Sequence, residues 1–428
     1  MSSALMLIFF ILLLFLGVPV VGAMGLGAIF YVAIFMDIPM NIIASQMFAG
    51  VNSVPLMAIP FFIIAGALME NGGISKRIVA FANSLVGHFP GGFGLAVVVA
   101  SAFFAAMTGS GAACVAAIGG MMIPAMVDNG YDKDFACALQ AAGGSLGPII
   151  PPSILMVLFS CCTANSVGDM LLAGVIPGIM IAVAFAIVTL WISKKHGYKG
   201  TSKFSLRNVW NTFKTSIWAL LTPMIILGGI YSGLFTPTEA SAVSCLYAII
   251  IGFFVYKELT VQALIKSLYN SIKLIGQILG IVATTQIFSW ILAYAGLPQA
   301  IAAACATFSD NPSLFLILSM LVLLVVGCFL DPVPAVLIFA PILTPVALSL
   351  GLDPIHFGTL MVITFCIGLI TPPVGMTLFV AAGIGERPVM KVAAKIWPFV
   401  IAMCVCVLIM IFVPQIVTFL PNAGNVAA

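Results

Sequence analysis

The sequence predicts an all-α polytopic membrane protein with two inverted repeats, each containing a re-entrant helical hairpin and a broken helix. Two observations support this fold class. Apolar residues make up 63% of the 428 residues and charged residues only 6%, whereas an average soluble domain has roughly 25% charged residues. The second observation is internal repetition: the two Pro-Pro pairs, Pro151-Pro152 and Pro372-Pro373, lie 221 residues apart in similar surroundings.

The same shift aligns further residues around the two pairs. It places Pro124 on Pro345, Gly130 on Gly351, Asp132 on Asp353, Gly147 on Gly368 and Pro177 on Pro398. Chance predicts roughly 0.2 proline matches over about 70 aligned positions, and four occur. A duplicated unit interrupted by proline is typical of secondary transporters with inverted repeats and discontinuous helices. If the units are inverted, an odd number of membrane crossings must separate Pro151 from Pro372.

The first half of the chain shows three helical segments before the repeat core. A first span, Ala4 to Phe35, is interrupted near Gly17-Val18-Pro19, and we expect a retained helix rather than a cleaved signal. The second span, Val54 to Met69, is closed by Gly72-Gly73. Ser75 to Phe89 mixes cationic and apolar residues, which favours an amphipathic helix at the membrane surface.

The first repeat core combines two short apolar arms with a broken helix. Arms from Phe93 to Met107 and onward to Val127 flank a tip of small residues, 108–112. Each arm is shorter than the ~20 residues needed to cross a membrane, so the pair is predicted to be a re-entrant hairpin. The following half-helix, Phe135 to Leu146, is interrupted at Gly147 to Ser153, because three prolines within five residues prevent regular helix.

The second half begins with a basic segment and repeats this pattern. Six cations without an acid lie in residues 194–214, namely Lys194, Lys195, Lys199, Lys203, Arg207 and Lys214. This distribution predicts a cytoplasmic loop; contact with anionic lipid is compatible with it, and a nucleic-acid partner is disfavoured by the apolar flanks. The expected segments are spans Phe213 to Phe235 and Glu239 to Tyr256, a surface helix Glu258 to Lys273, hairpin arms Leu314 to Phe329 and Ala335 to Leu350, a half-helix Phe357 to Ile370, and a last helix Ile396 to Leu420.

The hairpin tips and the helix breaks carry the candidate chemistry. A broken helix frees backbone carbonyls, and these, with hydroxyls and a carboxylate, are hard oxygen ligands suited to Na⁺. The first candidate cation site comprises Thr108, Gly109, Ser110, Ser145 and Gly147, and the second comprises Leu330, Asp331, Ile367, Gly368 and Thr371. Because tips and half-helix N-termini present positive dipole ends, an anionic substrate is expected beside Ser110 and Asp331, between Ser153 and Thr377. Helix packing is an equal alternative for the last two hydroxyls.

Two acids have competing interpretations. Asp331 lies between apolar runs, where an uncompensated carboxylate costs at least ~2.5 kcal/mol; the alternative to a cation ligand is a cap for the Pro332 turn, which would leave its second oxygen free. Glu239 is expected to stabilise the first turn of a helix capped by Thr238. The ten cysteines and three histidines lack metal spacing, so no transition metal is expected, and no Walker motif indicates use of ATP.

Three motifs carry a resemblance to a known family. Gly147 to Ser153, Gly233 to Ala240 and Thr371 to Gly375 closely resemble the large membrane subunit of tripartite ATP-independent periplasmic (TRAP) transporters. The resemblance implies a sodium-driven symporter of the ion-transporter superfamily in the bacterial inner membrane, with an elevator-type transport domain moving against a scaffold. It places sodium at Ser110 and the Gly147-Pro148 break, and at Asp331 and the break from Gly368 to Thr371.

The resemblance also implies a domain plan and partners. The partners are a separate small membrane subunit of four helices and a periplasmic substrate-binding protein that delivers an organic acid anion, such as a C4-dicarboxylate, sialic acid or another sugar acid. The expected domains are 1–90 as scaffold and arm helices, 91–178 as the first transport repeat (hairpin 93–127, broken helix 135–165), 179–311 as scaffold with the basic loop and second arm helix, 312–395 as the second transport repeat (hairpin 314–350, broken helix 357–385), and 396–428 as the C-terminal helix.

Two other function classes were weighed against a transporter. A channel would also use re-entrant loops and backbone carbonyls, and large unitary currents would distinguish it. An intramembrane enzyme needs a nucleophile with a base or a metal pair, and the sequence contains neither an HExxH motif nor a paired aspartate motif. The sequence therefore favours a non-enzymatic transporter.

Overall fold

The computed structural model describes residues 2–36, 38–200, 204–305 and 311–427. Within these ranges the regular elements are all helices, which confirms the all-α class. Seven segments of the described chain are long and apolar enough to cross a membrane. They are α7, α10 with α11, α12, α13 with η2, α14, α17 and α20.

The first half contains eleven α-helices and one short 3₁₀ turn among its described residues. Their bounds are α1 Ser2–Phe15, α2 Val20–Phe35, α3 Asn41–Val51, η1 Pro55–Met57, α4 Ala58–Asn71, α5 Ile74–Val86, α6 Gly92–Thr108, α7 Gly111–Asp128, α8 Lys133–Ser145, α9 Ile154–Thr163, α10 Val167–Ala173 and α11 Val175–His196.

The second half contains the counterparts of most of these helices. Their bounds are α12 Leu206–Tyr231, α13 Pro237–Ile250, the π-turn η2 Ile251–Val255, α14 Val261–Tyr294, α15 Leu297–Cys305, α16 Pro312–Gly327, α17 Pro332–Ser349, α18 Pro354–Gly368, α19 Met376–Ile384, α20 Val389–Phe412 and α21 Gln415–Ala427.

The shift of 221 residues holds at the level of helix boundaries. It carries α7 onto the bounds of α17, and it carries α6, α8 and α9 to within a few residues of α16, α18 and α19. The correspondence reaches beyond the segment that the prolines mark, because α2 falls on α13 with η2, and α3 with α4 falls on α14. The duplication therefore covers nearly the whole chain.

Four sequence predictions about the helices are wrong in detail. The predicted first span is a helical hairpin, because the rings of Phe9 in α1 and Phe30 in α2 stack with centroids 4.4 Å apart. The fold-back occurs at Gly17, whose φ of +82° favours glycine. The helix α3 was not predicted; its polar residues mask the apolar pattern, and it meets the η1–α4 segment at an angle of 63°.

The other differences concern helix ends. The predicted surface helix Glu258 to Lys273 is the first part of the 34-residue helix α14, which contains no proline to stop it. The basic loop 194–214 is shorter than predicted, because α11 continues to His196 and α12 begins at Leu206; Lys203 lies outside the described residues. The predicted C-terminal helix begins earlier, at Val389, and a second helix, α21, follows Pro414.

The cap of α13 also differs from the prediction. Thr236, rather than Thr238, is the N-cap: its hydroxyl accepts the Glu239 N–H at 3.3 Å, and Glu239 Oε2 accepts the Thr236 N–H at 2.8 Å. This reciprocal pair is a capping box. The capping role predicted for Glu239 is confirmed.

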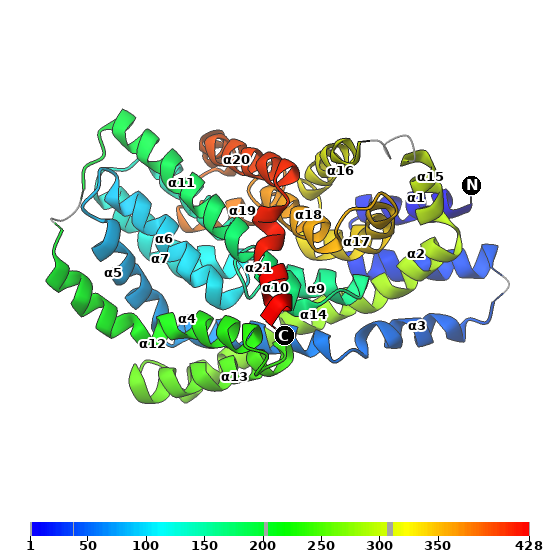
Figure 1. Cartoon of the computed structure of the whole chain (residues 1–428), viewed down its shortest axis with the longest axis horizontal. Coiled ribbons are helices and arrows are strands. Elements are labelled where there is room, and N and C mark those ends of the chain that lie inside the picture. Colours follow the sequence, from blue (N-terminus) through cyan, green and yellow to red (C-terminus); the bar gives the residue numbers. More distant parts are fainter. Residues whose placement is uncertain (1, 37, 201–203, 306–310, 428) are drawn as a thin grey trace.

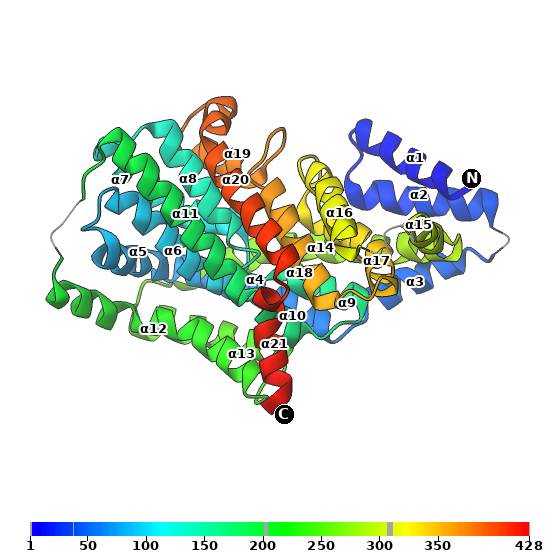
Figure 2. The ribbon, with the colours of Figure 1, turned by 45° about the horizontal axis from the view of Figure 1, so that its top comes forward.

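The repeats exchange the second halves of their broken helices. The molecule is elongated, with α1, α2 and α15 at one end and α5 and α12 at the other (Figure 1). Figure 2 shows the same arrangement from a second direction. Near the middle, α9 of the first repeat packs against α17 and α18 of the second, whereas α19 of the second repeat packs against α7 and α8 of the first. This exchange makes the two repeats one packing unit.

An ion pair joins the repeats at the end of this unit. Arg387, in the turn between α19 and α20, binds Asp134 at the start of α8 through two parallel hydrogen bonds, one of which joins Nη2 to Oδ2 at 3.0 Å. Bidentate arginine–carboxylate pairs are stronger and more directional than single contacts. The pair therefore fixes the loop of the second repeat to the first repeat.

We expect Arg387→Lys and Asp134→Asn each to lower the unfolding temperature of the purified chain by about 1 to 3 °C, since each loses the bidentate geometry. The double variant should be no less stable than the weaker single variant, because the two residues act as a unit. Thermal unfolding in detergent measures this, with Lys266→Gln as an exposed control. Fully additive losses in the double variant would contradict the coupling.

Candidate functional site

Each hairpin tip lies against the break of its own repeat, with a glycine at the contact. A Cβ on Gly147 would lie 2.6 Å from the carbonyl carbon of Ser110, and a Cβ on Gly368 would overlap the carbonyl oxygen of Gly327. Real Cβ atoms do not approach backbone so closely, so only glycine permits the contact. The two glycines occupy equivalent positions under the shift of 221 residues. The prediction that each tip faces its own broken helix is confirmed.

The first tip also touches the break of the second repeat. At Gly111, a Cβ would lie 3.0 Å from the Gly144 carbonyl oxygen and 3.1 Å from Thr377 Cγ2. At Gly109, a Cβ would overlap the Pro152 carbonyl oxygen. The first tip therefore lies between the two broken helices, and the two candidate cation sites are parts of one central structure.

The second tip is joined to its break by a backbone hydrogen bond. Val374 N donates to the Cys328 carbonyl oxygen at 3.2 Å. Both Pro-Pro peptide bonds, which lie in the two breaks, are cis. Pro151 and Pro152 are buried, whereas Pro373 is exposed, so the second break is the more open of the two.

The breaks free backbone carbonyls at equivalent positions. No hydrogen bond within the described residues reaches the carbonyl oxygens of Ser145 or Cys366, which correspond under the shift, because the next N–H groups bond elsewhere or belong to Pro148. The tip carbonyls of Thr108, Gly109 and Leu330 are free in the same sense. Buried carbonyls without partners are costly. Each site thus presents a set of oxygen atoms that suits a cation.

The side chains of the first site are mostly buried. The Thr108 hydroxyl donates to the Phe104 carbonyl at 3.2 Å and the Ser145 hydroxyl to the Ala142 carbonyl at 2.7 Å, so the oxygen lone pairs, rather than the protons, remain for a ligand. Ser110 is half-buried and caps α7, accepting the Ala113 N–H at 3.5 Å. Hydroxyl and carbonyl oxygens without a formal charge make up this site.

The second site contains the carboxylate. Asp331 is half-buried and caps α17, because its Oδ1 accepts the Val333 N–H at 2.9 Å. No contact within the described residues engages its Oδ2, and no cationic side chain there pairs with it. The cap and a cation-binding role are therefore compatible. The Thr371 hydroxyl donates to the Ile367 carbonyl at 2.7 Å, and the Gly368 carbonyl accepts the Thr371 N–H at 3.1 Å.

The predicted substrate residues Ser153 and Thr377 are fully buried. Ser153 caps α9 and donates its hydroxyl proton to the Pro148 carbonyl; Thr377 donates to the Leu369 carbonyl at 2.7 Å. Pro148 and Leu369 are equivalent under the shift, so each downstream half-helix binds the same carbonyl of its break. Both hydroxyls therefore shape the breaks in this conformation, beside the first tip.

Sequence reasoning missed three residues of this region. Cys366 escaped notice because its carbonyl, rather than its side chain, is the relevant group; the shift from Ser145 would have found it. Gln140 and Ser101 are fully buried, and the described residues offer no partner to either Gln140 amide atom or to the Ser101 hydroxyl. A lone amide in an apolar half-helix, opposite Met361 in the second repeat, was the available signal.

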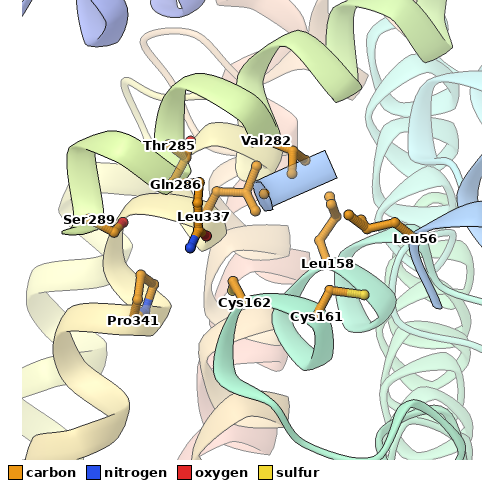
Figure 3. A pocket seen from close by; sticks show the side chains of 11 residues that line it. Leu56, Leu158, Cys161, Cys162, Val282, Thr285, Gln286, Ser289, Leu337 and Pro341 are labelled. Atoms are coloured by element: carbon orange, nitrogen blue, oxygen red, sulfur yellow. The ribbon is translucent and has the colours of Figure 1, made fainter. Parts of the chain in front are cut away.

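A small cavity separates the exchanged half-helix α9 from the long helix α14 (Figure 3). Cys161 and Cys162 approach from α9, Gln286 and Ser289 from α14, and Pro341 from α17. Its volume of about 40 Å³ is far below that of ligand pockets, which hold roughly 300–1,000 Å³. The cavity therefore marks an imperfectly packed boundary between these helices rather than a substrate pocket.

Comparisons with known proteins agree with this geometry. A family model described as the DctM component of the tripartite ATP-independent periplasmic transporters matches residues 7–416. The C4-dicarboxylate TRAP transporter large permease protein DctM of Rhodobacter capsulatus is 38% identical over 436 residues, covering 99% of both chains. The sialic acid TRAP transporter large permease protein SiaM of Vibrio cholerae is 38% identical over 410 residues, covering 96% of both.

Two further similarities extend the comparison. The isethionate TRAP transporter permease protein DctMQ of Oleidesulfovibrio alaskensis is 37% identical over 96% of this chain, which spans 65% of that longer protein. The crystal structure of the Alcanivorax borkumensis YdaH transporter superposes with a TM-score of 0.62 at 15% identity, covering 87% of this chain and 86% of that one. This last likeness concerns the fold alone.

We expect Gly147→Ala and Gly368→Ala each to destabilise the protein by about 1–3 kcal/mol or more, because a Cβ would force the tip away from the break. Gly120→Ala and Gly383→Ala are matched controls: their Cβ atoms would meet nothing within 4 Å, and alanine in a helix is favoured over glycine by about 0.5–1 kcal/mol. Thermal unfolding of the four variants provides the measurement. Equal stability across all four would refute the contact.

Proposed function

Because the chain belongs to the tripartite ATP-independent periplasmic transporters, as a DctM component, we propose that it imports an organic acid anion coupled to sodium. The observation that carries this proposal is the pair of tip-and-break sites with freed carbonyl oxygens at equivalent positions, Ser145 and Cys366. Carbonyl, hydroxyl and carboxylate oxygens replace water around a hard monovalent cation. Sodium at these sites would supply the driving force, and the chain supplies no site for ATP.

The proposed ligands follow from the oxygen atoms that have no other partner. In the first site these are the carbonyls of Thr108, Gly109 and Ser145, with the Ser110 hydroxyl beside Gly147 and Pro148. In the second site they are the Leu330 and Cys366 carbonyls and Asp331 Oδ2, with Ile367, Gly368 and Thr371 shaping the break. The second site contains a formal negative charge, so it should bind sodium more strongly.

The anion is proposed to bind beside the tips, where Ser110 and Asp331 border the half-helices that begin near Ser153 and Thr377. A cation at each tip would offset the negative charge of a carboxylate substrate. The relatives are named for C4-dicarboxylate, sialic acid and isethionate, all of them acids. An organic acid of this group is the proposed substrate class, delivered by a periplasmic binding protein and transported together with a separate small four-helix membrane subunit.

The proposed mechanism is an elevator motion. The exchange of α9 and α19 fastens the two repeats into one body, and the cavity between α9 and α14 lies at its boundary with α3 and α14 (Figure 3). A body packed internally through exchanged helices and loosely along this boundary favours movement as a unit against α3, α4, α13 and α14.

Helix order supports inverted repeats and a cytoplasmic basic end. Four long segments, α10 with α11, α12, α13 with η2, and α14, lie between the two breaks; the half-helices α9 and α18 add one crossing if α16 and α17 are re-entrant, which gives an odd number. The ends of α11 and α13 and the starts of α12 and α14 share one side. Those ends carry Lys194, Lys195, Arg207, Lys257 and Lys266, whereas Glu239 marks the opposite side.

Sodium coupling is tested by reconstitution with the small subunit and the binding protein in liposomes. We expect uptake of a labelled organic acid to require an inward sodium gradient and to increase with an inside-negative potential, which contributes about 2.3 kcal/mol per net charge per 100 mV. Uptake that persists undiminished without the gradient would refute the coupling. Large unitary currents in planar bilayers would instead support a channel.

Asp331→Asn tests the second site directly. The amide keeps the cap on Val333 but loses the charge, so the sodium concentration for half-maximal uptake should rise about tenfold or more. Glu239→Gln is the matched control: it removes a charge from a helix cap, and should affect stability rather than sodium dependence. An unchanged sodium dependence in Asp331→Asn would exclude the carboxylate as a ligand.

A further inference from the structure

A second cavity lies away from the tips, between the start of α8, the end of α11 and the first turns of α20. Its volume is about 180 Å³, which is room for several water molecules or a small polar group. We call it the α11–α20 cavity. It is lined by Asp132, Phe135, Trp191, Ile192, Lys195, His196, Tyr198, Ala394, Lys395 and Pro398. Figure 2 shows α11 and α20 side by side, and the two helices contact each other.

Cations from both repeats converge on this cavity. Lys195 belongs to α11 and Lys395 to α20, and Lys391 lies one turn before Lys395 on the same face. Two acids of α8 face these cations, but both are engaged: Asp132 Oδ1 accepts the Phe135 N–H at 2.9 Å, and Asp134 is paired with Arg387. The surplus charge is therefore positive.

The wall of the cavity is held in place by aromatic contacts. The Tyr198 ring stacks on Tyr131 with centroids 4.1 Å apart, and its hydroxyl accepts the Asp132 N–H at 3.1 Å. The His196 ring stacks on Tyr198 and its Nδ1 bonds the Ile192 carbonyl at 3.0 Å. Such a wall needs little rearrangement to receive a ligand.

The surroundings place the cavity at the membrane surface. Trp191 and Trp397 flank it and are 60% and 50% exposed, and exposed tryptophans are enriched where lipid headgroups meet the hydrocarbon. Lys195 Nζ lies 5.6 Å from the centre of the Trp191 ring. The apolar part of the lining suits the glycerol and first methylene groups of a lipid, whereas a soluble anion would gain nothing from it.

We propose that the α11–α20 cavity binds the phosphate headgroup of an anionic phospholipid of the leaflet on the basic side. Lys195 and Lys395 contact the phosphate, and Trp191 packs beside the glycerol backbone. Because the two lysines come from different repeats, one lipid would bridge α11 and α20. This site is independent of the proposed sodium and substrate sites, and its test does not require transport.

The test is native mass spectrometry of the full-length chain in detergent, with phosphatidylglycerol, phosphatidylethanolamine, glycerol 3-phosphate and inorganic phosphate as separate additions. Wild-type protein should retain phosphatidylglycerol in preference to phosphatidylethanolamine. The double variant Lys195→Gln/Lys395→Gln should bind phosphatidylglycerol about 30-fold more weakly, at about fivefold for each lysine near an anionic lipid. Lys266→Gln/Lys273→Gln is the matched control, with the same charge change on α14.

A conservative variant distinguishes lost charge from lost folding. Lys195→Arg/Lys395→Arg should keep the preference for phosphatidylglycerol and match the unfolding temperature of the wild type. Equal retention of phosphatidylglycerol by the glutamine variant and the α14 control would overturn the proposal. So would displacement of the lipid by inorganic phosphate or glycerol 3-phosphate at equal concentration, because the site would then bind a soluble anion.

Discussion

A backbone carbonyl that leaves a helix inside an apolar body must find another partner, and the centre of this molecule depends on that constraint. Proline at the two breaks removes the donors that would serve Ser145 and Cys366. Part of the resulting demand is met internally, by Ser153 at Pro148 and Thr377 at Leu369. The remaining oxygens are concentrated where the hairpin tips arrive, so the structure that breaks the helix also creates the ligand set.

The close approach of tip and break depends on glycine at Gly147 and Gly368, and on the exchange of half-helices between repeats. Since α19 packs against α7 and α8, the first tip meets Thr377 of the other repeat as well as its own break. A change at either break is therefore felt at the first tip. This arrangement offers a physical route by which two cations and one anion can influence each other without direct contact.

Much of this architecture could be predicted from sequence because it rests on local chemistry. Prolines and glycines mark the breaks and tips to within a few residues, as at 146–153 and 108–112. The fold-back of α1 on α2, the unbroken length of α14 and the exchange of α9 with α19 depend on packing between distant segments, which periodicity does not record. The Cys366 carbonyl was missed for a related reason: its freedom follows from hydrogen-bond register rather than from residue type.

The two repeats share backbone geometry but differ in side chains, and the difference is systematic. The first has Ser110, Ser145 and the orphaned Gln140 where the second has Asp331, Cys366 and Met361. A buried site made of neutral dipoles holds a cation more weakly than one that includes a carboxylate, but it also releases the cation more readily. Duplicated backbone with unequal charge therefore gives two sites that fill in sequence: the carboxylate site first, and the neutral site only when the tips have closed.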